Sequence, residues 1–227
     1  MVKINKKAVY VCISVAVCCG LMTLVDGVIR PPYFVKSAIK VLLFMALPMA
    51  FGRMYKMKVF SILKPEKRSI VTGLLLGGGT FAVVLTAYFI LAPYIDLSAV
   101  PEALSKNAGV TKENFPIVAI YIALCNSLLE EFFFRGFGFL RLKESTSTGF
   151  AMVFSSAAFA VYHGAMMEGW MDPILTVLLL AALFGCGVFF NLLNLKRECI
   201  WSSWLTHLFA NLAINTIGMI LLGCFAP

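Results

Sequence analysis

The sequence predicts an all-α protein built as a polytopic bundle of transmembrane helices. Of its 227 residues, 61% are hydrophobic and only 13% are charged, whereas a soluble domain carries about 25% charged residues. The apolar residues fall into seven segments, each able to hold the roughly 20 residues that a membrane-spanning helix needs. We therefore expect a single membrane domain over residues 1–227 and no separate soluble domain.

In chain order, the predicted spans are 8–29, 34–52, 70–93, 116–140, 149–168, 173–195 and 201–225. The first follows three lysines, as a secretory signal would, but it lacks a clear small-residue cleavage site, so we interpret it as a retained span. The second is the weakest, because Lys36, Lys40 and Pro48 interrupt it. The fifth is short enough to be partly re-entrant, and the glycines at 77–79 allow a neighbouring helix to approach the third closely.

The distribution of basic residues predicts a cytoplasmic N-terminus. With that orientation, 13 basic residues lie on the inner side and 5 on the outer side. The inner set is Lys3, Lys6, Lys7, Arg53, Lys56, Lys58, Lys64, Lys67, Arg68, Arg141, Lys143, Lys196 and Arg197. The outer set is Arg30, Lys36, Lys40, Lys106 and Lys112. This pattern explains the net charge of +8 by topology rather than by nucleic-acid binding, and we expect an integral protein of a bacterial plasma membrane.

The fourth predicted span contains three charged residues, Glu130, Glu131 and Arg135. An ionised group near the bilayer centre costs roughly 2.5–3.5 kcal/mol on insertion scales, so three of them predict a buried polar site. Glu131 and Arg135 are four residues apart and share a helical face, so we expect an ion pair. Glu130 points elsewhere and is predicted to be the carboxylate left free to act. The alternative is a salt-bridge cluster that only fixes helix packing.

Both histidines of the chain lie in predicted spans, His163 in the fifth and His207 in the seventh. Asn211 follows His207 by four residues and so shares its helical face. With a rise of about 1.5 Å per residue, Glu130 lies roughly 15 Å from the cytoplasmic end of its span, His207 about 10 Å, Asn211 about 16 Å and His163 about 21 Å. One shared polar layer in the inner to middle membrane is therefore feasible.

These residue types suit hydrolysis by water. A carboxylate in a poorly solvated site can act as a general base near neutral pH, and a histidine can share or relay the proton. A second histidine and an asparagine can donate hydrogen bonds to a developing oxyanion. Glu130, His163 and His207 could instead hold zinc. Because no H-E-x-x-H motif is present, we rank a metal-free mechanism first and expect no cofactor.

Three short motifs follow one another on separate predicted spans: Glu130-Glu131-x-x-x-Arg135, Phe159-x-x-x-His163 and His207-x-x-x-Asn211. As a set they resemble the motifs of the CPBP family of intramembrane proteases. That family includes the type II CAAX prenyl endopeptidases and bacterial bacteriocin-processing or self-immunity (Abi) proteins. The resemblance covers about residues 116–215, which we take as the catalytic core, and the first three spans match only in hydrophobic character.

The resemblance implies an intramembrane endopeptidase that hydrolyses a membrane-associated peptide or protein. It implies that Glu130 activates the attacking water and that His163 assists it. It also implies that His207 and Asn211 stabilise the oxyanion. The partners expected are the peptide or protein substrate and the lipid bilayer, without nucleic acid.

The resemblance gives Glu131 and Arg135 a structural or substrate-orienting role and makes Phe159 a packing residue. Members commonly have eight spans where this sequence predicts seven, so we expect a final helix to be absent. Two other function classes stay open: a non-enzymatic bacteriocin-immunity or membrane scaffold protein, and a proton-coupled transporter. The transporter is the weaker of these, because no repeat halves are evident.

Overall fold

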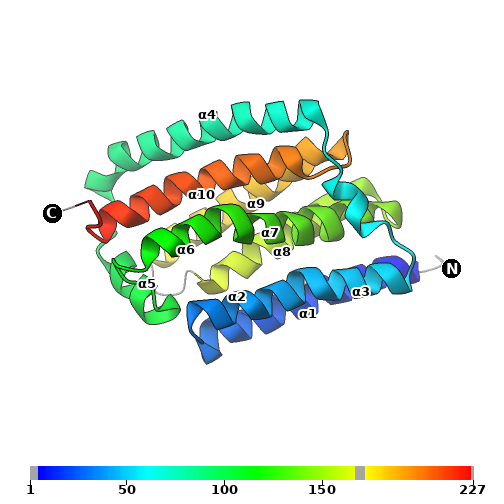
Figure 1. Cartoon of the computed structure of the whole chain (residues 1–227), viewed down its shortest axis with the longest axis horizontal. Helices are drawn as coiled ribbons and strands as arrows, with labels where there is room; N and C mark the ends of the chain where they lie inside the picture. Colours follow the sequence, from blue (N-terminus) through cyan, green and yellow to red (C-terminus); the bar gives the residue numbers. More distant parts are fainter. Residues whose placement is uncertain (1–4, 167–171, 226–227) are drawn as a thin grey trace.

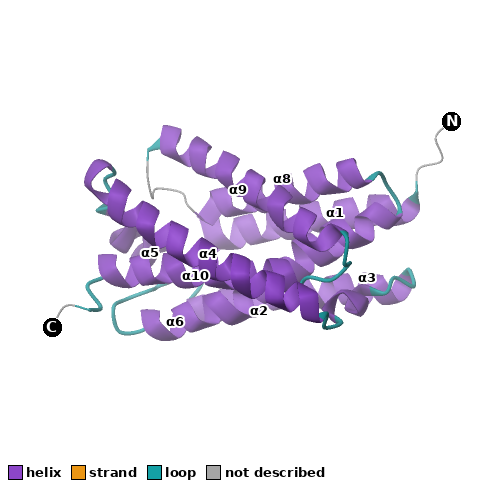
Figure 2. Cartoon of the chain, turned by 90° about the horizontal axis from the view of Figure 1, so that it is seen from above, coloured by secondary structure: helices purple, strands orange, loops and turns teal. Residues whose placement is uncertain are grey.

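The computed structural model describes residues 5–166 and 172–225, and over these residues the chain forms helices and no strand (Figure 2). The long helices lie side by side along the molecule, with the two ends of the chain at opposite ends of the bundle (Figure 1). The predicted all-α helical bundle is confirmed.

The α-helices are α1 (Lys6–Leu24), α2 (Tyr33–Val41), α3 (Leu47–Met54), α4 (Lys67–Leu91), α5 (Ala99–Ala108), α6 (Phe115–Tyr121), α7 (Ser127–Glu130), α8 (Thr148–Met166), α9 (Pro173–Leu195) and α10 (Trp201–Leu221). Four π-helical segments extend or join them: η1 (Val25–Ile29), η2 (Leu42–Ala46), η5 (Ile122–Asn126) and η6 (Glu131–Arg141). Three 3₁₀ segments complete the described elements: η3 (Val59–Leu63), η4 (Ala92–Tyr94) and η7 (Leu142–Glu144).

Six helices of the described chain are long and apolar enough to cross a membrane. They cover Lys6–Ile29, Tyr33–Met54, Lys67–Tyr94, Phe115–Glu144, Pro173–Leu195 and Trp201–Leu221. They match six of the seven predicted spans, including the one judged weakest. The chain is therefore an integral, polytopic membrane protein.

The remaining predicted span, 149–168, corresponds to α8, and its positions 167–168 lie outside the described residues. Helix α8 is not among the six helices found within the described residues, and it ends at their border, at Met166. The polar residues of α8 include Ser155, Ser156 and His163. The two serines are fully buried, which indicates that α8 directs its polar groups into the protein rather than toward lipid.

Side-chain caps define where several helices begin. The Asn5 side chain accepts a hydrogen bond from the first turn of α1, and Glu66 accepts two from the first turn of α4. Asp172 does the same for α9, directly before Pro173. Each cap satisfies backbone N–H groups that have no partner inside the helix.

Close approaches between helices occur where the sequence offers glycine. Helix α4 lies along α10 (Figure 1), and a Cβ atom on Gly77 would stand 2.6 Å from the ring of Phe209. Gly78 and Gly79 face open space, so the predicted role of this glycine run belongs to Gly77 alone. Helices α8 and α9 meet in the same way, because a Cβ on Gly187 would lie 2.9 Å from the backbone of Ser156.

An aromatic cluster joins α2–α3, η6 and α8 beside the charged residues of the fourth span. Phe44 stacks on Phe133 with ring centroids 4.0 Å apart and meets Phe134 and Tyr162 edge-on at 5.6 and 5.3 Å. These four side chains are all at most 1% exposed. The cluster therefore fixes the second span against the fourth and against α8.

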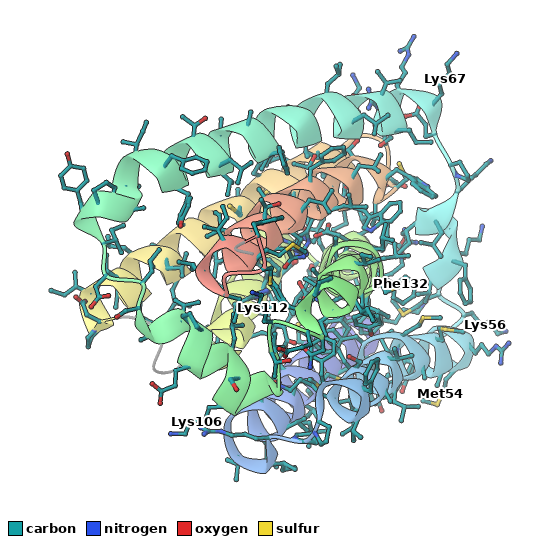
Figure 3. The ribbon with its side chains drawn as sticks, turned by 60° about the vertical axis from the view of Figure 1, so that its left-hand side comes forward. Met54, Lys56, Lys67, Lys106, Lys112 and Phe132 are labelled. Atoms are coloured by element: carbon teal, nitrogen blue, oxygen red, sulfur yellow. The ribbon has the colours of Figure 1, made fainter. Side chains whose placement is uncertain are left out.

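The basic loop residues separate to the ends of the bundle. Lys56 and Lys67 lie at one end and Lys106 at the other (Figure 3). This agrees with the predicted assignment of Lys56 and Lys67 to one side and Lys106 to the opposite side. Lys40, predicted for the outer side, instead lies inside the bundle and is 5% exposed.

Candidate active site

The two adjacent glutamates lie where helix α7 passes into the π-helical segment η6. Glu130 is the last residue of α7 and Glu131 the first of η6. Their exposed fractions are 1% and 0%, so both carboxylates are enclosed by protein. Because they are one residue apart on a helix, they point in different directions, as predicted.

Glu131 belongs to an ion pair that links the fourth span to α10. Its Oε1 atom lies 3.3 Å from Nη1 of Arg135 and 2.9 Å from Nδ1 of His207. The Arg135 guanidinium is fully buried and lies over the ring of Phe159, with Cζ 3.9 Å from the ring centroid. The ring of Phe190 lies 5.0 Å from the same atom. The predicted Glu131–Arg135 pair is confirmed.

Glu130 has a cationic partner that the sequence did not reveal. Its Oε1 atom accepts hydrogen bonds from Nζ of Lys40 at 2.5 Å and from Nδ2 of Asn126 at 3.0 Å. The prediction of an unpaired Glu130 is therefore wrong, as is the placement of Lys40 among the outer loop charges. The physical reason is that an ammonium deep in a bilayer is as unfavourable as a carboxylate, so the two charges stabilise each other.

The second oxygen of Glu130 faces both histidines. Oε2 lies 3.5 Å from Nε2 of His163 and 3.7 Å from Nε2 of His207. Both separations are longer than an ordinary hydrogen bond. Among the described residues, Oε2 has no hydrogen-bond partner. Of the four side chains expected in one polar layer, these distances bring together Glu130, His163 and His207.

The other ring nitrogens of the histidines fix how the rings are protonated. Nδ1 of His163 lies 2.8 Å from the carbonyl oxygen of Phe159, and Nδ1 of His207 lies 2.9 Å from the Glu131 carboxylate. Both of these oxygens can only accept, so each Nδ1 is a donor. In the neutral rings, each Nε2 then carries a lone pair and lies 3.5 or 3.7 Å from Oε2 of Glu130. Such a group of acceptors is suited to hold a donor molecule, and water is the simplest one.

Aromatic side chains hold the two imidazoles in place. The ring of His207 stacks on Phe190 at 5.5 Å and meets Phe159 edge-on at 6.0 Å. The ring of His163 contacts Phe159 at 4.3 Å and Tyr162 at 5.2 Å. Phe159 thus packs as predicted, with Arg135 and both histidines around it. The His163 side chain is 15% exposed, whereas that of Glu130 is 1% exposed.

The Asn211 amide has a backbone partner in the fourth span. Its Nδ2 atom donates to the backbone carbonyl of Ile122 at 3.3 Å, next to the start of η5. The structure therefore brings together the other six predicted side chains, Glu130, Glu131, Arg135, Phe159, His163 and His207, and directs the Asn211 amide to the backbone of the fourth span.

Two polar residues of the site were not predicted, namely Lys40 and Asn126. Asn126 precedes Glu130 by four residues, a spacing that places both on one helical face and would have pointed to it. Lys40 lies well inside an apolar span, and the rule that singled out Glu130 applies to it equally.

Within residues 5–166 and 172–225, no group of three His, Cys, Asp or Glu side chains has the arrangement of a metal site. The zinc alternative, which would use Glu130, His163 and His207, stays a prediction for experiment. Lys40 also occupies one oxygen of the carboxylate that such an ion would need.

A family model described as type II CAAX prenyl endopeptidase Rce1-like matches residues 112–213. The matched segment contains all three motifs and nearly coincides with the predicted core, 116–215. Neither a curated protein nor a solved structure matches the chain. The match over residues 112–213 supports an assignment of this segment to the CPBP/CAAX protease family.

Proposed function

We propose that the protein is an intramembrane endopeptidase in which Glu130 activates water to hydrolyse a peptide bond of a membrane-associated peptide or protein. Family membership indicates a protease with a peptide or protein substrate. One observation supports the finer proposal. The two oxygens of Glu130 have different surroundings, since Oε1 is held by Lys40 and Asn126 while Oε2 faces two histidine nitrogens at 3.5 and 3.7 Å.

The proposed step begins with a water molecule near Oε2. Atoms 3.5 and 3.7 Å apart can share one water at about 2.8 Å from each. Oε2 takes a proton from this water as its oxygen attacks the carbonyl carbon of the peptide bond. The proton then passes to the amide nitrogen, the C–N bond breaks, and the products are a carboxylic acid and an amine. His163 holds the water through Nε2 while this occurs.

The oxyanion partners are proposed on weaker geometric support. His207 can donate from Nε2 only when both of its ring nitrogens carry protons, because Nδ1 already donates to Glu131. Asn211 would have to release the carbonyl of Ile122, to which its amide donates at 3.3 Å. We therefore propose that His207 is the first oxyanion donor and that Asn211 joins it when substrate enters.

The substrate class follows from the matched family and the position of the site. The family description names a prenyl endopeptidase for CAAX sequences, so a peptide ending in a prenylated CAAX sequence is the first substrate to test. Glu130 and the two histidines lie on helices that form the membrane bundle, so a substrate anchored in lipid reaches them within the bilayer. An unprenylated peptide of the same sequence shows whether the lipid is required.

The test uses the purified full chain in lipid nanodiscs with an internally quenched, farnesylated CAAX peptide. We expect Glu130→Gln to lower kcat by at least about 100-fold, the lower end of what a general base contributes. Glu102→Gln, an exposed position in α5, is the matched control and should keep the wild-type rate. Undiminished cleavage by Glu130→Gln would remove Glu130 from the mechanism.

A second function is favoured by the burial of the charges. Glu130, Glu131 and Arg135 are at most 1% exposed, and with Lys40 they form two opposite-charge pairs. Such a cluster also suits a non-enzymatic immunity or scaffold protein, in which the ion pairs only fix the helices. That function predicts that Glu130→Gln keeps the biological activity. A zinc-dependent protease is distinguished by cleavage that a chelator abolishes and added zinc restores.

A further inference from the structure

Lys40 is a fully enclosed ammonium on α2, outside the segment that matches the protease family. Its side chain is 6% exposed, and Nζ donates to Glu130 Oε1 at 2.5 Å and to Asn126 Oδ1 at 2.6 Å. The same nitrogen lies 5.3 Å from the ring centroid of Phe44 and 5.0 Å from that of Tyr162. The charge therefore has an acidic, an amide and two aromatic partners.

The three polar side chains form a closed ring of hydrogen bonds. Lys40 donates to the Asn126 carbonyl oxygen and to Glu130, while the Asn126 amide nitrogen donates to the same oxygen of Glu130 at 3.0 Å. Because the two donors approach Oε1 from different residues, they fix both the position and the rotation of the carboxylate. Oε2 is left as the oxygen that faces the histidines.

We propose that Lys40, together with Asn126, is a positioning residue for the reaction, an inference that rests on the proposed function of Glu130. The pair decides which oxygen of Glu130 takes the proton from water and holds that oxygen between the two imidazoles. Lys40 also places a positive charge 2.5 Å from the enclosed carboxylate, which offsets part of the cost of burying that charge. Neither residue contacts the reacting atoms directly.

A second lysine on the same helix provides a matched control. Lys36 precedes Lys40 by one helical turn and also forms an ion pair with a buried acid, since its Nζ lies 2.8 Å from Oδ1 of Asp26. Asp26 lies in η1, so this pair joins the first two spans. Replacing Lys36 tests the loss of a lysine ion pair on α2 without altering the contacts of Glu130.

The experiment compares Lys40→Met, Lys36→Met and Asn126→Leu in nanodiscs, with the farnesylated CAAX peptide as the probe. We expect Lys40→Met to lower kcat about 100-fold, the loss that a misplacement of about 1 Å can cause, with KM changed less than about twofold. Asn126→Leu should lower kcat about tenfold with the same pattern, since one of two donors remains. Lys36→Met should keep kcat within about twofold of wild type.

The outcomes separate this inference from the proposed function. If Glu130→Gln is inactive but Lys40→Met folds and keeps the wild-type kcat, the positioning role is overturned while the function stands. A loss confined to KM overturns it as well. If Lys40→Met does not yield folded protein, Asn126→Leu decides, and a wild-type kcat in that variant overturns the inference. Activity in Glu130→Gln instead overturns the function itself.

Discussion

Replacing Arg135 should destabilise the bundle more than almost any other single change, for a reason that can be worked from its contacts. Arg135 and Glu131 are both 0% exposed, and Nη1 lies 3.3 Å from Oε1. In Arg135→Met, the hydrocarbon stem is retained but the Glu131 carboxylate stays enclosed with His207 as its remaining close partner. Breaking a buried ion pair in this way costs about 3–5 kcal/mol.

The assay is reversible unfolding of the purified protein by sodium dodecyl sulfate in mixed micelles, followed by circular dichroism. The double variant Glu131→Gln/Arg135→Met removes both charges. Its loss in free energy of unfolding, relative to wild type, should be less than half of the loss in Arg135→Met. The reasoning is refuted if Arg135→Met loses less than about 1 kcal/mol, or if the double variant is no more stable than the single one.

Two further predictions concern packing and surface charge. Gly187→Ala should lower the free energy of unfolding by about 1–3 kcal/mol, because its Cβ would lie 2.9 Å from the backbone of Ser156, whereas Gly185→Ala, with nothing within 4 Å, is the control. A similar loss in both variants would contradict this. Lys143 lowers the pKa of Glu198 by hydrogen bonding to it and by its charge. The stability from this pair is therefore present above the ordinary pKa of a glutamate and is lost as the pH falls through the lowered value. Since the Glu198 side chain is 60% exposed, the loss between pH 7 and pH 3 should be at most about 1 kcal/mol, and Glu198→Gln should abolish this part of the pH dependence of unfolding.

Hydropathy predicted most of the architecture because a bilayer imposes a simple requirement on every spanning segment. Runs of about 20 apolar residues gave the positions of six spans to within a few residues. Helix α8 occupies the fifth predicted segment and directs Ser155 and Ser156 into the protein interior.

The site was predictable where its residues share a helix or a motif, and less so across helices. The i,i+4 spacing predicted the Glu131–Arg135 pair, and the motif order led to His163 and His207 near Glu130. Spacing along one helix does not determine which way a lysine on another helix points. For that reason Lys40 was placed among the outer charges, although it and Glu130 lie 90 residues apart in the chain and touch.

Asn211 shows the converse difficulty. It shares a helical face with His207, but its amide donates to the carbonyl of Ile122 rather than reaching Glu130. Helical periodicity gives the face of a side chain and not the acceptor that it finds there. A backbone carbonyl in a π-helical segment is one such acceptor, and sequence patterns do not predict where π-helical segments form.

The origin of Lys40 also limits how the chain can be divided. The charge that balances Glu130 comes from α2, whereas the protease-like segment begins at residue 112. A fragment that starts there would contain Glu130, Glu131, Arg135 and both histidines. Its Glu130 would lie in the membrane without Lys40, its counter-ion. Replacing the helices before residue 112 by those of another membrane protein would preserve the site only if the new helices placed a lysine at the position of Lys40.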